Sequence, residues 1–356
     1  MHQIQAAVLR AGGGPLHLES LDLGGPRDDE VLVRLAASGV CHTDIDFLEG
    51  HAEPPVILGH EGAGVVAEVG RQVRRFKPGD HVVLSYQSCG RCPLCRQGRP
   101  TACEHFWDLN FGFQRLDVSN AYSDGVQGHF FGQSSFATQT LATSRNLVKV
   151  PPDLPLKLLA PLGCGMQTGA ATVLNLLKIP KKSSIAVLGT GAVGLAAVMA
   201  ACIAGANPII GVDIKPARLE LALELGATHA IDSSREEVIP RIREITGRGV
   251  DYVLEITGDP AMYRAGAEAL KPKGTMALIA SPGRGGSLPE GRKIIGSIQG
   301  DAVPQKFIPK LIALYREGKF PFDRLLKFYE FREINQAIAD ALQGDTIKPV
   351  LVINEI

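Results

Sequence analysis

Between residues 185 and 300, short apolar runs alternate with segments of helical length and pattern. The apolar runs read as strands and comprise residues 185–189, 208–213, 228–232, 251–257, 274–281 and 293–298. The helix-length segments lie between the first five runs, at residues 192–204, 216–225, 235–246 and 260–270. This alternation predicts an α/β fold with a doubly wound, six-stranded parallel sheet.

The two ends of the chain follow a different pattern. Up to about residue 150, β-branched runs at 30–35, 64–69 and 81–85 are separated by glycines, with a turn signal at 77–80. These short runs favour an irregular β domain. After about residue 300, helical patterns at 304–317 and 331–343 precede a strand-like run at 349–353. We expect this tail to fold back onto the first domain.

Composition indicates a globular protein with more than one domain. A chain of 356 residues is longer than a single domain usually is. Hydrophobic residues make up 45% of it and charged residues 21%. Lysine plus arginine and aspartate plus glutamate number 37 each, so the formal net charge is zero. A neutral chain argues against nucleic acid or an anionic membrane as partner. Small molecules and other subunits are the expected partners.

Nothing in the sequence predicts export or membrane insertion. The first ten residues lack the basic start and apolar region of a secretory signal, and no run of about 18 apolar residues is present. Seven cysteines in such a chain are expected to be reduced and available to metal. We therefore expect a cytoplasmic protein.

A glycine-rich loop follows the first of the predicted parallel strands. Gly189, Gly191 and Gly194 form the pattern Gly-x-Gly-x-x-Gly between this strand and a helix, and Asp213 ends the next strand. In that context the pattern indicates a dinucleotide-binding loop rather than an ordinary glycine-rich turn. The loop residues expected to approach the diphosphate are Gly189, Gly191, Ala192, Val193 and Gly194.

Asp213 indicates which dinucleotide binds. A carboxylate accepts hydrogen bonds from the adenosine ribose hydroxyls of NAD, whereas it would repel the 2′-phosphate of NADP. NAD is therefore the favoured cofactor, although Lys215 and Arg218 nearby keep NADP open.

Four of the cysteines form a compact lobe at residues 89–103. Cys89, Cys92, Cys95 and Cys103 stand in the pattern Cys-x2-Cys-x2-Cys-x7-Cys, with turn residues between them. Four thiolates saturate a tetrahedral zinc ion, so we predict a closed, structural site. The main alternative, a zinc module that binds nucleic acid, is disfavoured because the lobe has only three arginines in a neutral protein.

Cys41, His60 and Cys164 are scattered along the chain, and each alone would be unremarkable. Their combination with the cysteine lobe and the dinucleotide loop makes them candidate ligands of a second zinc. Two thiolates and one imidazole leave the fourth position open to water or substrate, as in catalytic sites. The two thiolates also cancel the charge of the ion, leaving a neutral centre that can bind an alcohol oxygen.

Over essentially its whole length the chain resembles the zinc-containing alcohol dehydrogenases of the medium-chain dehydrogenase/reductase superfamily. The resemblance is carried by Gly-His-Glu-Gly-Ala-Gly at residues 59–64, the cysteine lobe and the dinucleotide loop, in the order of that family. Stretches that look more specifically like the aryl (benzyl) alcohol dehydrogenase branch are 130–150, 300–304, 320–323 and 347–350.

This resemblance implies the domain organisation and two zinc ions per chain. A GroES-like catalytic domain, built as an irregular β-barrel, is expected from residues 1–160 and 301–356. A Rossmann NAD-binding domain is expected at residues 161–300. A homodimer or homotetramer is expected as well.

The resemblance also implies roles for residues around the second zinc. Cys41, His60 and Cys164 match its ligands. Glu61 is expected behind the metal as an occasional ligand, and Asp44 matches the carboxylate that orients the ligand imidazole.

Further roles concern proton transfer and the cofactor. Thr43 matches the hydroxyl that hydrogen-bonds the alcohol and starts a proton relay. His42 and Lys348 match residues that contact the cofactor diphosphate. Arg218 matches a residue that contacts the adenosine ribose, and Thr168 matches one on the nicotinamide side.

One position departs from the pattern of many relatives. Asp46 stands where they have the histidine that passes the proton to solvent. An aspartate has an ordinary pKa near 4, which suits neutral operation poorly unless burial raises it. His51 is an alternative proton carrier, although an exposed loop histidine is the simpler interpretation of it.

The expected reaction is hydride transfer between NAD and a primary alcohol or aldehyde, aryl or allylic. Ser85 occupies a pocket position where aromatic residues are common in relatives, and the smaller side chain would leave room. Trp107 and its aromatic neighbours either line an apolar pocket or pack the cysteine lobe. Alternatives are a biosynthetic aldehyde or enal reductase of the same fold, and a non-catalytic protein that binds zinc and NAD.

Overall fold

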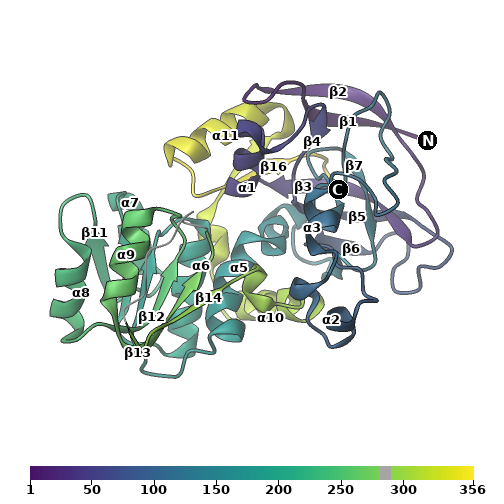
Figure 1. Ribbon diagram of the computed structural model, residues 1–356. Helices are drawn as coiled ribbons and strands as arrows, with labels where there is room; N and C mark the ends of the chain where they lie inside the picture. Colours follow the sequence, from purple (N-terminus) through teal and green to yellow (C-terminus); the bar gives the residue numbers. More distant parts are fainter. Residues whose placement is uncertain (281–289) are drawn as a thin grey trace. The chain divides into compact units, whose positions relative to one another are not determined.

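The computed structural model describes residues 1–280 and 290–356, which form two compact units (Figure 1). The first unit comprises Met1–Cys164, Val303–Lys310 and Asp323–Ile356. The second comprises Gly165–Ala302 and Leu311–Phe322. In the described part of the chain, no helix has both the length and the apolar character needed to cross a bilayer.

The second unit is built on a six-stranded sheet with the strand order β11-β10-β9-β12-β13-β14. All five strand pairs are parallel, which confirms the predicted sheet. The strands are β9 (Ile185–Leu188), β10 (Ile209–Asp213), β11 (His229–Asp232), β12 (Val250–Glu255), β13 (Leu270–Leu278) and β14 (Lys293–Gly296). The central strands β9, β10 and β12 are largely buried and rich in Ile, Val and Leu, as parallel strands covered by helices must be.

The helices of this unit run from teal to green in Figure 1. They are α5 (Gly165–Ala171), η5 (Thr172–Leu176), α6 (Ala192–Ala204), α7 (Pro216–Glu224), α8 (Val238–Thr246), α9 (Pro260–Ala269) and η6 (Gln299–Asp301). The chain runs outward from β9 to β10 on one side and returns to β12 on the other. The strand order therefore reverses beside β9, which is the position where such sheets bind ligands.

The first unit contains two β-sheets. A three-stranded sheet has the order β2-β1-β4, formed by β1 (His2–Leu9), β2 (Leu16–Leu23) and β4 (Val56–Ile57). A seven-stranded sheet has the order β15-β16-β3-β5-β6-β8, with β7 also paired to β3. Its strands are β3 (Glu30–Gly39), β5 (Glu61–Val69), β6 (His81–Leu84), β7 (Gln139–Thr143), β8 (Leu147–Lys149), β15 (Leu326–Glu330) and β16 (Lys348–Val352).

Short helices fill the connections of this unit. They are α1 (His42–Asp46), η1 (Phe47–His51), α2 (Pro93–Arg96), η2 (Pro100–Ala102), α3 (Phe106–Phe111), η3 (Phe130–Gly132), α4 (Leu156–Leu159), η4 (Ala160–Gly163), η8 (Phe331–Glu333) and α11 (Ile334–Gln343). Two further helices are α10 (Pro304–Arg316) and η7 (Phe322–Leu325). The mixture of short strands and single helical turns matches the irregular β domain expected from the sequence.

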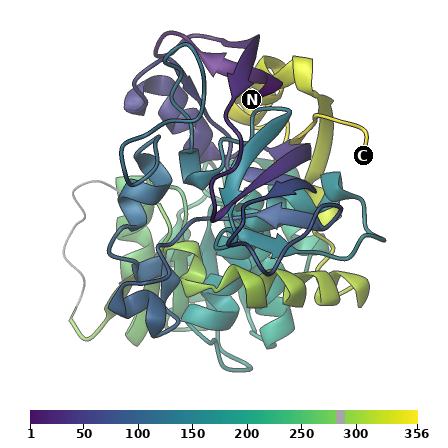
Figure 2. The same ribbon diagram turned by 90° about the vertical axis from the view of Figure 1, so that its right-hand side faces the viewer.

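The C-terminal segment joins the sheets of the first unit. Strand β16 pairs antiparallel with β3, so that Val350 lies opposite Gly39. Both ribbon views place α11 beside the N-terminal strand pair (Figure 2). The Asn335 side chain bonds both the amide and the carbonyl of Leu16, at 2.9 Å each. These contacts bring residues from both ends of the sequence to the candidate metal site.

Several element boundaries differ from the sequence prediction. Strand β13 begins at Leu270, inside the predicted helix, because this residue already pairs with Val250 of β12. Its predicted last residue, Ser281, lies outside the described residues. The β1–β2 pair was not predicted at all, although its register is regular from His2 opposite Leu23 onwards.

Candidate active site and metal centres

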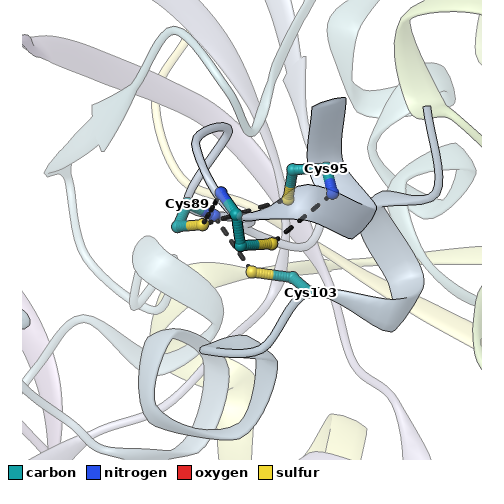
Figure 3. A group of neighbouring side chains, drawn as sticks. Cys89, Cys95 and Cys103 are labelled. Atoms are coloured by element: carbon teal, nitrogen blue, oxygen red, sulfur yellow. Dashed lines mark hydrogen bonds between the residues drawn. The ribbon is translucent and has the colours of Figure 1, made fainter. Parts of the chain in front are cut away.

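Four cysteines of the first unit converge on one point. The sulfur atoms of Cys89, Cys92, Cys95 and Cys103 all lie within 4.8 Å of one another (Figure 3). Cys92 is the N-cap of α2, and Gly90 turns the chain with a φ of 72°. A left-handed turn of this kind favours glycine. The local sequence therefore wraps three thiols around a single centre, and Cys103 closes it from the following segment.

Backbone amides point at these sulfur atoms. The amides of Cys92 and Cys89 donate to Cys89 Sγ and Cys103 Sγ at 3.3 Å each, and the amide of Cys95 donates to Cys92 Sγ at 3.4 Å. Hydrogen bonds from the Glu104 and Cys95 backbone lower the pKa of Cys92 to about 6, whereas burial raises the pKa of Cys103 to about 12. Four thiolates can ionise together only around a cation, so the donor set fits a structural zinc.

A second group of potential ligands lies elsewhere in the same unit. Cys41, His60, Glu61 and Cys164 place one ligand atom each within 4.8 Å of one another. Cys41 follows β3, His60 and Glu61 stand at the start of β5, and Cys164 follows η4. The fold thus brings together the three sequence segments that carry the predicted zinc ligands.

The surroundings of this group favour a positive charge. Nε2 of His60 is buried and has no hydrogen-bond partner among the described residues. Burial alone would lower the pKa of His60, but the negative charges of Asp44 and Cys41 raise it well above its usual value. A hydrogen bond from Cys164 lowers the pKa of Cys41 in spite of burial. A metal ion can take the place of the shared protons, so the residues fit a cation held by two thiolates and an imidazole.

Asp44 connects the ligand segments. Its Oδ1 accepts from Nδ1 of His60 at 2.8 Å and from the Gly59 amide at 3.1 Å, while Oδ2 accepts from the Cys41 amide at 2.9 Å. The side chain is fully buried. A carboxylate on one ring nitrogen of a histidine leaves the other nitrogen free to bind metal. Asp44 thereby holds two of the three candidate ligands in place.

Glu61 points back toward the C-terminal strand. Its carboxylate accepts from Nζ of Lys348 at 2.9 and 3.0 Å, and the same ammonium donates to the Val40 carbonyl at 2.9 Å. A Cβ on Gly39 would clash with this carboxylate, so glycine makes the space for it. Burial raises the pKa of Glu61, against the opposing charge of Lys348.

This arrangement bears on the role expected for Lys348. Its side chain is 3% exposed, and all three ammonium protons are donated within the first unit. Contact with a cofactor diphosphate therefore stays a prediction for this residue. What the structure shows is a buried ion pair beside the candidate metal site.

Helix α1 carries the residues expected in proton transfer. Thr43 is partly exposed, with its hydroxyl 4.0 Å from Cys41 Sγ. Asp46 approaches Nε2 of His42 at 3.4 Å, and both side chains are exposed. His51 bonds the Asp46 backbone carbonyl through Nδ1 at 2.7 Å rather than the carboxylate. The candidate relay residues thus line one side of a single short helix and its C-terminal extension.

The two predicted pocket residues have different environments. Ser85 is fully buried and donates from Oγ to the Gly163 carbonyl at 2.6 Å, next to Cys164. Trp107 is 64% exposed and stacks on Phe111 at 5.2 Å between ring centroids. The exposed tryptophan therefore packs on the outside of α3, whereas Ser85 supports a ligand segment.

Two further features were missed by the sequence analysis. The buried amide of Gln133 donates to the carbonyls of His60 and Ser85, and its oxygen accepts from the Gly62 amide. The ring of Phe131 stacks on the His60 imidazole at 4.4 Å. No spacing pattern marks either residue, because both reach the site through a loop in left-handed backbone.

The dinucleotide loop lies in the second unit, between β9 and α6. Gly189 has a φ of 95°, and Gly191 is the N-cap of α6, which begins at Ala192 and Val193. A Cβ on Gly194 would clash with the Gly189 carbonyl, whereas one on Gly191 would meet only open space and the edge of a guanidinium. The three glycines thus have the separate roles expected of a loop that cradles a diphosphate.

Asp213 ends β10 beside this loop. Its Oδ2 accepts from the Thr190 amide at 2.7 Å and hydroxyl at 3.0 Å, and Oδ1 accepts from the Ile214 and Lys215 amides. Nη1 of Arg218 lies 4.0 Å from the ideal Cβ position of Gly191, and its buried Nε has no partner among the described residues. The cradle above Gly191 and this orphaned donor fit a nucleotide.

Thr168 lies in α5 of the second unit and is buried. Its hydroxyl donates to the Gln299 side-chain oxygen at 3.3 Å, and Gln167 donates to the same oxygen at 3.0 Å. This network holds α5 against η6. The nicotinamide contact of Thr168 stays a prediction.

Comparisons with known proteins give a consistent result. A family model described as alcohol dehydrogenase GroES-like domain matches residues 27–152, and one described as zinc-binding dehydrogenase matches residues 192–315. Geraniol dehydrogenase from Castellaniella defragrans is 45% identical over 98% of this chain and 97% of its own length.

Two crystal structures share the whole fold. Benzyl alcohol dehydrogenase from Acinetobacter calcoaceticus is 44% identical with a TM-score of 0.97, over 99% of this chain and 100% of that one. An alcohol dehydrogenase zinc-binding domain protein from Burkholderia ambifaria is 49% identical with a TM-score of 0.96, at the same coverage. These matches confirm the predicted pairing of a GroES-like domain with a Rossmann domain.

Proposed function

Because the chain belongs to the zinc-containing alcohol dehydrogenases of the medium-chain dehydrogenase/reductase superfamily, we propose that it oxidises a primary allylic or benzylic alcohol with NAD. One zinc would be held by Cys41, His60 and Cys164, and a second by the four-cysteine lobe. The observation that carries the proposal is the convergence of the His60 imidazole and two thiols in one small space, where the buried Nε2 of His60 has no hydrogen-bond partner among the described residues. Three ligands leave a position open for substrate.

The bound groups and the chain divide the chemistry between them. When present, zinc supplies Lewis acidity that lowers the pKa of an alcohol, and NAD accepts the hydride. The overall reaction converts the alcohol and NAD⁺ into the aldehyde, NADH and one proton. The chain has to hold the ligands, orient the alcohol and conduct that proton away.

Residues around the candidate zinc are arranged for these tasks. Asp44 holds His60 in the tautomer that leaves Nε2 free, and it also anchors the Cys41 segment. The Thr43 hydroxyl, 4.0 Å from Cys41 Sγ, is close enough to accept a proton from an alcohol oxygen at the site. Asp46 lies exposed on the same helix and can pass the proton to water, whereas the contact of His42 with the cofactor diphosphate stays a prediction.

NAD is proposed over NADP on the environment of Asp213. Its carboxylate is held by four hydrogen bonds at the end of β10, next to the glycine loop. A fixed negative charge there favours two ribose hydroxyls and disfavours a phosphate. The expected result is a much higher kcat/KM with NAD than with NADP.

The substrate class is proposed from the relatives and the aromatic side chains. Geraniol and benzyl alcohol both carry the reacting carbon next to an unsaturated carbon. In this chain Phe111, Phe130 and Phe131 form an aromatic cluster that contacts His60 directly. Aromatic side chains beside a metal site favour flat, apolar substrates over short aliphatic ones.

The direct test is NAD reduction followed at 340 nm with geraniol, benzyl alcohol, ethanol and hexanol, together with the zinc content per chain. We expect two zinc ions and efficient turnover of the first two alcohols. His60→Ala should lose one zinc and all turnover while retaining its fold. Full activity in a zinc-depleted protein would contradict the proposal.

A further inference from the structure

The loop that carries Phe130 and Phe131 has an unusual backbone. His129, Phe131 and Gly132 have φ angles of 62°, 53° and 64°. This left-handed region is easy for glycine and unfavourable for a bulky side chain such as phenylalanine. An unfavourable conformation persists only where its surroundings enforce it, and it often marks a functional position.

Surrounding hydrogen bonds enforce this conformation. The amide of Gly132 donates to the His129 carbonyl at 2.7 Å, and the amide of Gln133 to the Phe130 carbonyl at 3.0 Å. Asn146 donates from Nδ2 to the Gly132 carbonyl at 3.0 Å. All of these residues are buried. The loop therefore presents the Phe131 ring in one fixed direction.

The Phe131 ring lies against the face of the His60 imidazole. The two rings stack with their centroids 4.4 Å apart and their planes 21° from parallel. Phe130 meets the same imidazole edge-on at 5.5 Å and 88°. The His60 ring thus contacts two aromatic rings, which also contact each other at 5.0 Å, in addition to its bond to Asp44.

The aromatic contacts restrict a rotation of the His60 ring that its hydrogen bond to Asp44 leaves free. The χ2 torsion of histidine is broad, and a single hydrogen bond at Nδ1 allows the ring to tilt about that bond. Tilting would move Nε2 away from Cys41 and Cys164. A ring stacked on the imidazole face blocks this motion because a parallel neighbour leaves no space for it.

We propose that Phe131 is a positioning residue for the zinc ligand His60, and that the left-handed loop exists to deliver its ring to the imidazole. This inference rests on the zinc site proposed above. Phe131 acts through His60 and contributes no atom to the metal. Residues that orient metal ligands commonly change metal affinity by about 10- to 100-fold when they are replaced.

The chain offers a closely matched control. Phe113 is also buried, also has a left-handed backbone with φ of 55°, and belongs to the same aromatic cluster. Its ring contacts are to Phe47 and Phe130, and within the described residues it makes no ring contact with His60. Phe113→Leu therefore reproduces the loss of an aromatic ring and the backbone setting without touching the ligand.

The experiment compares Phe131→Leu, Phe131→Tyr and Phe113→Leu with the unaltered protein. Zinc release to a chromogenic chelator is followed over time, and the phase that is missing in His60→Ala identifies the His60 site. We expect Phe131→Leu to accelerate this phase by about 10-fold or more, whereas release from the cysteine lobe is unchanged. Phe131→Tyr retains a stacked ring and should release zinc as the unaltered protein does.

A spectroscopic readout separates positioning from general packing. With Co²⁺ replacing zinc at the His60 site, we expect Phe131→Leu to shift or broaden the ligand-field bands, and Phe113→Leu to leave them unchanged. If Phe131→Leu does not fold, Phe131→Met removes the ring with less change of volume. Equal effects of the Phe131 and Phe113 variants, or no effect of either, would overturn the inference. Absence of a His60-dependent zinc in the unaltered protein would instead overturn the proposed function.

Discussion

At the scale of single residues, the candidate active site depends on buried side chains that hold others in place. Asp44 links the segments of Cys41 and His60, and Lys348 neutralises Glu61 beside them. The family resemblance implied the role of Asp44, whereas no sequence pattern connects Lys348 with Glu61, which is 287 residues away. Both can be tested one side chain at a time.

The first prediction concerns Asp44. Asp44→Ala removes the acceptor for His60 Nδ1 and for two backbone amides. We expect the affinity for the zinc proposed at the His60 site to fall by about 10- to 100-fold, with a parallel loss of activity. Zinc retained after dialysis against a chelator measures the effect. Glu49→Gln, on the exposed end of the same segment, is the control and should keep its zinc.

The second prediction concerns Lys348. Lys348→Met leaves the Glu61 carboxylate buried without its cation, so the free energy of unfolding should fall by about 3–5 kcal/mol. The double variant Lys348→Met with Glu61→Gln removes the stranded charge and should recover part of that loss. Urea unfolding measures both. A double variant as unstable as the single one would show that the ion pair is not the cause.

At the scale of elements, a few contacts decide where strands and loops end. Helix α6 starts at the glycine loop because Gly194 packs against the Gly189 carbonyl. Strand β3 starts at Glu30, which forms an ion pair with Arg115 of a distant loop. The glycine loop and helix α6 lie at the predicted residues, since that signal is local. Binding of a dinucleotide there stays a prediction. No sequence pattern connects Arg115 with Glu30, so this ion pair could not be predicted.

The third prediction compares two loop glycines. In Gly191→Ala the new methyl group points into open space, so we expect the thermal unfolding temperature to stay unchanged. The affinity for NAD should fall, because the methyl group would occupy the proposed diphosphate cradle. Gly194→Ala clashes with backbone and should lower both. Calorimetric titration with NAD and thermal unfolding separate the outcomes. Unchanged NAD affinity in Gly191→Ala would place the diphosphate elsewhere.

The fourth prediction concerns pH. Glu30 is buried and accepts from Arg115 at 2.5 and 3.0 Å and from the Arg27 amide. Burial acts to raise the pKa of Glu30, but these donors lower it overall, below the ordinary 4.5. A lowered pKa in the folded state stabilises the protein above pH 4.5, and this stabilisation is lost as pH falls through the folded-state pKa.

Glu30→Gln should therefore lower the free energy of unfolding by about 2 kcal/mol at pH 7, with a smaller difference at pH 4. Asp28→Asn breaks the exposed pair with Arg71 and is the control, for which a smaller change is expected. Denaturant unfolding at both pH values measures the difference. A cost of Glu30→Gln that does not depend on pH would rule out the charge as its source.

At the scale of the whole molecule, apolar cores stabilise both units, and the first unit has in addition a cysteine lobe with little regular structure. The second unit has a parallel sheet with a continuous apolar core. In the first unit the cysteine lobe consists of single helical turns, α2 and η2, joined by loops. A segment with so little regular structure depends on cross-links, so the lobe zinc is expected to stabilise the fold, and the His60 site to serve chemistry.

The fifth prediction follows from this difference. Removing the His60-site zinc with a chelator should abolish activity and leave the thermal unfolding temperature almost unchanged. Further removal of the lobe zinc should lower that temperature clearly, because the four thiols lose their common partner. Zinc analysis and thermal unfolding on the same samples make the comparison, and zinc added back should restore activity. Equal stability of all three forms would contradict a structural role for the lobe.

The sequence by itself determined the parts of this protein that depend on local patterns. The alternation of apolar runs and helices predicted the parallel sheet, and the spacing of glycines and lobe cysteines predicted two binding loops, because near neighbours in sequence stay near in space. Only the tertiary structure decided how distant segments meet. It brings Cys41, His60 and Cys164 together, pairs Lys348 with Glu61, and lays Phe131 on His60. These contacts arise from strand pairing and loop conformation, which place residues far apart in the chain side by side and leave no periodic trace in the sequence.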